Sequence, residues 1–154
     1  MGTIIVATDG SEMAREAAAA GLHLLRPGQD VVIATVVDVP DPDLALDATG
    51  HAGPTMTPAQ LEAEHEGAKA EGRAIVDALE TSLRSAALLE TEAERLVLVG
   101  HPGRELCRLA ETADADAIVM GSRGRGGIKR ALLGSVSDHV VRNAPCPVVV
   151  STSP

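Results

Sequence analysis

The fold class is indicated first by Thr3-Ile4-Ile5-Val6-Ala7-Thr8-Asp9-Gly10-Ser11, in which a short β-branched run ends directly in a polar turn. A nearly continuous apolar run without alternating polar residues is typical of a parallel strand that is covered on both faces. A helical pattern follows over 12–25 and stops at Pro27-Gly28. Its buried stripe is predicted to consist of Met13, Ala17, Ala20 and Leu24.

The same alternation of strand and helix repeats to the end of the chain. Further apolar runs lie at 31–37, 95–99, 117–120 and 148–150. Three more helical patterns separate them: one from Thr57-Pro58 with a stripe of Ile75, Leu79, Ser82 and Ala86, one near 103–113, and one from Ser135 to before Pro145. This order predicts a single α/β domain over 1–154, a Rossmann-like, doubly wound sheet of five parallel strands with helices on both faces.

Two glycine-containing loops mark the expected ligand site, because such sheets bind ligands beyond the carboxyl ends of strands where the winding reverses. The loops are Asp9-Gly10-Ser11 and Gly121-Ser122-Arg123-Gly124. Backbone amides beside Gly121 and Gly124 can approach phosphate oxygens, and free N–H groups at Gly134-Ser135 favour an anion. On composition alone, a glycine-rich turn followed by an ordinary capped helix explains these residues equally well.

The charge and the composition limit the kinds of partner that the chain is expected to bind. The net charge of −9 disfavours nucleic acid and anionic membranes, yet 121–130 carries Arg123, Arg125, Lys129, Arg130 and no acid. This cluster predicts a local anion site, with a solvated charge run as the alternative. The chain has no Phe, Tyr or Trp, so it cannot stack bases on aromatic rings and any adenine must lie between aliphatic walls. No signal peptide or membrane-length apolar run is visible, so we expect a cytoplasmic protein.

Several common motifs are missing from the sequence. There is no Gly-Lys pair for a Walker A loop, no G-x-G-x-x-G, no G-x-S-x-G, and no metal-ligand spacing among the histidines. We therefore predict no catalytic residue and no protein metal site. The segment 38–56 is rich in Pro and Gly, which predicts either a mobile flap beside the site or plain disorder.

Between Met120 and Ser137, the pattern Gly121-x2-Gly124-x9-Gly134-Ser135 resembles the ATP-binding signature of the universal stress proteins. The opening Ile5–Ser11 resembles their first strand and turn. Gly100-His101-Pro102 resembles the start of their third helix, and Asn143–Val148 the approach to their last strand. The resemblance thus runs nearly the full length. It implies a strand order of 3-2-1-4-5 and a homodimer through the last strand, which lies at a sheet edge.

The resemblance also implies site roles for ATP with Mg²⁺. Asp9, Ala7 and Thr8 would contact the nucleoside and ribose, although Asp9 also suits a turn without any ligand. Val36 would pair its backbone with adenine, and Met120 and Gly121 would flank the sugar. The phosphates would be held by Arg123, Gly124, Gly134, Ser135 and Val136.

The function implied by the resemblance is that of a nucleotide-dependent regulator in the stress response, with a protein partner that the sequence does not name. The alternatives are a slow ATPase or phosphoryl-transfer protein, and an interaction module whose nucleotide site stays empty. Phosphoryl transfer needs metal ligands, positioned charge and an oriented nucleophile. Asp9 is the only evident acidic candidate at the site, which favours binding over turnover.

Overall fold

A computed structural model describes residues 2–25, 28–38, 57–124 and 133–152 of the 154-residue chain. Within these ranges the strands are β1 (Thr3–Ala7), β2 (Asp30–Val37), β3 (Glu94–Val99), β4 (Ala117–Gly121) and β5 (Val148–Ser151). The helices are α1 (Glu12–Leu24), α2 (Pro58–Ser85), α3 (Pro102–Thr112) and α4 (Ser135–Asn143). Each predicted strand is present, with its ends shifted by at most one residue.

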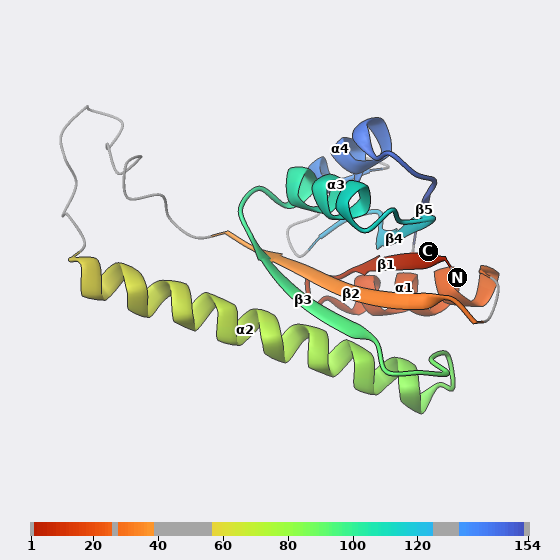
Figure 1. The fold of residues 1–154 in the computed structure, drawn as a ribbon, viewed down its shortest axis with the longest axis horizontal. Coiled ribbons are helices and arrows are strands. Elements are labelled where there is room, and N and C mark those ends of the chain that lie inside the picture. Colours follow the sequence, from red (N-terminus) through yellow and green to blue (C-terminus); the bar gives the residue numbers. More distant parts are fainter. Residues whose placement is uncertain (1, 26–27, 39–56, 125–132, 153–154) are drawn as a thin grey trace.

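The five strands form one parallel sheet in the order β3-β2-β1-β4-β5, which confirms the predicted topology. At the centre, Val6 of β1 is in register with Ile33 of β2 on one side and with Val119 of β4 on the other. Figure 1 shows α3 and α4 on one face of the sheet and α1 and α2 on the other. The result is the three-layer arrangement expected of a doubly wound fold.

Each face of the sheet buries its own apolar cluster. The cluster under α3 and α4 includes Ile5, Ala34, Ile118, Leu106 and Val140. The cluster under α1 and α2 includes Ile4, Val6, Ile33, Val119, Val76, Leu79 and Leu83. Because neighbouring residues of a strand point to opposite faces, a strand buried on both faces needs an unbroken apolar run.

The predicted helical stripes were wrong in part. Helix α1 buries Ala14, Ala17, Ala18 and Gly21, and Leu24 is 79% exposed. Helix α2 buries Leu79 as predicted, but it buries Val76 and Leu83 in place of their neighbours Ile75 and Ser82. The physical reason is close approach: a Cβ at Gly21 would lie 2.3 Å from Cγ1 of Val119. Small residues let the helix backbone lie close to the sheet. A pattern of hydrophobicity alone does not show which of these small residues are buried.

The buried carboxylate of Glu80 ties α2 to the segment before β3. Its Oε1 accepts hydrogen bonds from Arg84 Nε (3.0 Å) and from the backbone N of Ala93 (3.3 Å), and Arg95 Nε lies 3.3 Å from Oε2. Burial alone would raise the pKa of Glu80, but these hydrogen bonds and the two arginine charges outweigh it and lower the pKa below its usual value.

Some predictions fall on segments outside the described residues. They include the segment 38–56 beyond Asp38, and the basic residues Arg125, Lys129 and Arg130.

Across the described ranges, none of the helices combines the length and apolar character of a bilayer-spanning segment. Cys107 and Cys146 are half-buried free thiols beside the core under α3 and α4, and burial raises the pKa of both.

Candidate functional site

The winding of the sheet reverses between β1 and β4. From β1 the chain proceeds outward to β2 and β3, and then crosses back to β4 and β5. The carboxyl ends of β1 and β4 therefore lie side by side, and their following loops, 8–11 and 122–124, diverge from a common crevice. Such a crevice is the usual ligand position in open parallel sheets.

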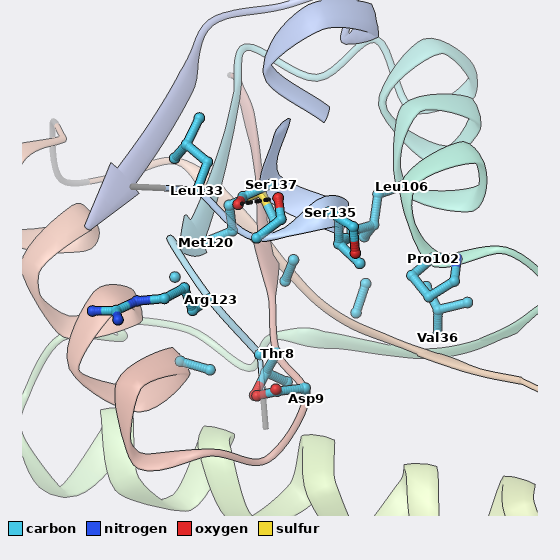
Figure 2. Close-up of a pocket in the computed structure, with 17 residues that line it drawn as sticks. Thr8, Asp9, Val36, Pro102, Leu106, Met120, Arg123, Leu133, Ser135 and Ser137 are labelled. Atoms are coloured by element: carbon cyan, nitrogen blue, oxygen red, sulfur yellow. Dashed lines mark hydrogen bonds between the residues drawn. The ribbon is translucent and has the colours of Figure 1, made fainter. Parts of the chain in front are cut away.

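A cavity of about 520 Å³ occupies this crevice, within the size range of small-molecule sites. The cavity is lined by every residue to which the resemblance assigned a role: Ala7, Thr8, Asp9, Val36, Met120, Gly121, Arg123, Gly124, Gly134, Ser135 and Val136. The structure thus brings together residues from β1, β2, β4 and α4 that are far apart in the sequence (Figure 2).

One wall of the cavity is apolar and has no aromatic ring. Figure 2 shows Val36, Pro102 and Leu106 together on one side, from β2 and α3. Met120 and Ala34, both buried, add to the apolar lining. A flat apolar group such as a purine could lie against this wall, in keeping with the aliphatic walls expected from the composition.

The turn after β1 is fixed by its own side chains. Thr8 Oγ1 accepts a hydrogen bond from Gly10 N (3.1 Å), and Asp9 Oδ1 accepts one from Ser11 N (2.9 Å). Gly10 has a φ of 81°, which glycine adopts without strain. Asp9 therefore fills the turn role that was its alternative interpretation. It also reaches the other loop, because a Cβ at Gly124 would lie 3.1 Å from Asp9 Oδ2.

The N-terminus of α4 faces the same cavity without a side-chain cap. Gly134 is the N-cap residue, and the first backbone bond of the helix runs from Asp138 N to Gly134 O at 2.9 Å. Within the described part of the chain, the amides of Ser135 and Val136 have no hydrogen-bond acceptor. The amide of Gly134 is different, because it donates to Ser122 O at 2.6 Å. Gly134 is thus not a free amide donor as the sequence suggested, and it contributes close backbone packing.

Arg123 supplies the positive side chain of the lining. Its Nε is buried and finds no hydrogen-bond partner among the described residues. In Figure 2 its side chain extends away from Val36, Pro102 and Leu106 on the opposite wall. An uncapped helix N-terminus carries about half a positive charge, so the polar end of the cavity favours an anion.

The cavity also has lining residues that the sequence argument missed. They are Ala14, Ala34, Pro102, Leu106, Leu133 and Ser137. Pro102 begins α3 after the edge strand β3, away from the reversal of winding, so the rule that named the loops after β1 and β4 does not point to it. Ser137 is the third residue of α4, where no motif marks it. Among the described residues, no group of three or more His, Cys, Asp or Glu side chains could hold a metal ion.

Comparison with known proteins agrees with this architecture. Residues 1–151 match the model of the universal stress protein family. Universal stress protein MJ0531 of Methanocaldococcus jannaschii is 36% identical over 152 residues, covering 98% of this chain and 82% of that protein.

Solved structures of similar fold include universal stress protein UspA from Lactobacillus plantarum, with a TM-score of 0.73 and 26% identity, covering 97% of this chain and 96% of that one. Another is a universal stress protein in complex with cAMP, with a TM-score of 0.63 and 26% identity, covering 97% of this chain and 94% of that one. From the fold, the crevice and the family match together, the chain belongs to the universal stress protein family.

Proposed function

We propose that this protein binds an adenine nucleotide in the crevice between β1 and β4, with ATP and Mg²⁺ as the ligand, and acts as a nucleotide-dependent regulator in the stress response. The proposal places the chain in the subgroup of its family that carries the Gly121-x2-Gly124-x9-Gly134-Ser135 pattern and binds ATP.

One observation carries the proposal. A single cavity joins an apolar wall to a polar end made of the 122–124 loop and the uncapped start of α4. An adenine ring suits the apolar wall, and phosphates suit the free amides of Ser135 and Val136 and the buried Nε of Arg123. The two halves thus match the two chemically distinct ends of a nucleotide. The universal stress protein solved with cAMP shows an adenine nucleotide bound to the same fold at 26% identity.

The residues of the site fit a metal ion that arrives with the phosphates. Mg²⁺ usually takes one or two protein carboxylates plus substrate phosphates, and keeps several waters. Asp9 is the acidic side chain among the lining residues. Asp9 would supply the protein carboxylate to such an ion, and the ion would neutralise phosphate charge. The described residues offer no separate protein cage for a metal.

Binding rather than turnover is the proposed activity. The lining includes no Lys and no His among the described residues, and the carboxylate of Asp9 already accepts a hydrogen bond from Ser11 N. Efficient phosphoryl transfer relies on a positioned base or water-orienting group together with charge at the transferred phosphoryl group. We therefore infer that the nucleotide biases the conformation or the partner choice of the protein.

Thermal unfolding with and without ATP and Mg²⁺ tests the proposal. A ligand at about 100 times its Kd stabilises by about 2.7 kcal/mol, which raises Tm by roughly 5–11 °C for a chain of this size. The variant G124V should lose the shift, because its side chain would lie against Asp9 Oδ2 and fill the polar end.

The matched control is G67V, because a Cβ at Gly67 of α2 meets no atom within 4 Å. This variant should keep the full shift. A wild-type melting curve that is unchanged across millimolar ATP with Mg²⁺ contradicts the proposal, and so does a shift of equal size in G124V.

A further inference from the structure

Ser137 occupies an unusual place in the site. Ser137 is 2% exposed and is the third residue of α4. Its Oγ lies 2.6 Å from the carbonyl oxygen of Ser122 and 3.0 Å from that of Gly134. Figure 2 marks the contact with Gly134 by a dashed line. A hydroxyl has one proton to donate, so the shorter contact makes Ser122 O the main acceptor.

Ser122 is the point where three elements meet. It is fully buried, and its N–H donates to Ser151 O of β5 at 2.9 Å. Its carbonyl oxygen accepts from both Gly134 N and Ser137 Oγ, each at 2.6 Å. A carbonyl oxygen has two lone pairs, so both are used. The 122–124 loop is thereby fixed to the start of α4.

This arrangement has an electrostatic consequence for the polar end of the cavity. A carbonyl oxygen directed at a phosphate would repel it, because both carry negative charge. The two donors hold Ser122 O against α4. The segment 134–137 approaches the loop closely enough that a Cβ at Gly134 would lie 3.4 Å from both Ser122 O and Arg123 Cα. The side chain of Arg123 in the loop and the free amides of Ser135 and Val136 at the helix start are therefore held at the same end of the cavity.

We propose that Ser137 is a positioning residue for the phosphate half of the site. It keeps the 122–124 loop and the uncapped N-terminus of α4 in the arrangement that a phosphate chain requires. This inference rests on the proposed nucleotide binding. It goes beyond that proposal, because it makes Ser137, a residue outside the glycine pattern, responsible for the preference of the site for phosphorylated over unphosphorylated ligands.

The expected effect is specific to phosphates. Without the hydroxyl, the loop has to be ordered when the ligand binds. Ordering about one backbone residue corresponds to a roughly 5- to 30-fold weaker Kd for ATP with Mg²⁺. Adenosine uses the other half of the cavity, so its Kd should stay within about twofold.

Isothermal titration of ATP with Mg²⁺ and of adenosine into four proteins tests the inference. They are the wild type, S137A, S137C and V140A. S137C nearly keeps the shape of serine and has a weaker donor, so it should lose part of the ATP affinity, and it provides the test if S137A fails to fold. V140A removes a fully buried side chain of the same helix outside the cavity lining, so it controls for loss of packing.

The inference predicts that the ratio of adenosine Kd to ATP Kd falls in S137A, falls less in S137C and is unchanged in V140A. An unchanged ATP Kd in S137A or S137C overturns it, as does an equal loss for both ligands or the same change of ratio in V140A. If the wild type binds neither ligand, the proposed function itself fails and this inference fails with it.

Discussion

Replacing Gly21 of α1 by alanine should destabilise the protein, although alanine is the better helix former. A Cβ at this position would lie 2.3 Å from Cγ1 and 2.9 Å from Cγ2 of Val119. Val119 is fully buried in β4, and both of its methyl groups lie within 3 Å of the added Cβ. The helix would have to move away from the sheet.

The magnitude follows from two opposing effects. Alanine gains about 1 kcal/mol over glycine inside a helix. Overpacking a well-packed core costs about 1–3 kcal/mol, and contacts this short indicate the upper part of that range. The net loss for G21A is therefore about 1–2 kcal/mol. Gly67 of α2 is the matched control, because no atom lies within 4 Å of its added Cβ. G67A should gain about 1 kcal/mol.

Urea unfolding of both variants measures the difference, which should be about 2–3 kcal/mol. V119A should lose stability alone but less in the G21A background, with a coupling of about 1 kcal/mol, because the new methyl group fills part of the vacated space. If G21A is as stable as G67A, then α1 does not pack against β4 at Gly21 as closely as described, and the reasoning fails.

Three further predictions concern other parts of the molecule. E80Q should cost about 2 kcal/mol at pH 7, by loss of ionic hydrogen bonds to Arg84 and Arg95. Because the folded-state pKa of Glu80 is lowered, this difference should be complete above about pH 4.5 and fade as the pH falls through that lowered pKa, as followed by urea unfolding at several pH values. The half-buried strand β5 lies at the sheet edge, so sedimentation at micromolar concentration should show a two-fold dimer that V149K dissociates, and a lone species near 15.8 kDa in the wild type would contradict it. ATP turnover should stay well below the ~10 s⁻¹ typical of enzymes, and a rate in that range that D9A abolishes would contradict binding without efficient turnover.

The strands could be predicted from the sequence because burial on both faces leaves nearly continuous apolar runs, whereas their order followed from the family resemblance. The runs 4–7 and 117–120 are apolar without a break, as expected of parallel strands that are covered by helices on both faces. The loops after β1 and β4 were located by a rule of topology, whereas the individual site residues were named from the resemblance, which missed Pro102, Leu106 and Ser137 among others.

The helix faces and the hydrogen bonds of the site could not be predicted in the same way. In α1, four consecutive alanines give nearly equal hydrophobicity on several faces, and the contact of Gly21 with Val119 decides the orientation. The role of Ser137 depends on Ser122, fifteen residues earlier, and on the strand-to-helix geometry that joins them. The amide of Gly134 was expected to be free, and tertiary packing assigns it to Ser122 O.

Native mass spectrometry in the presence of millimolar ATP and Mg²⁺ counts the ligands bound per chain and so tests nucleotide binding itself. Each wild-type chain should carry one ATP, G124V should carry none, and G67V should bind as the wild type does. A wild-type spectrum without nucleotide at these concentrations, or a G124V spectrum that matches the wild type, would contradict the assignment of the crevice between β1 and β4 as a nucleotide site.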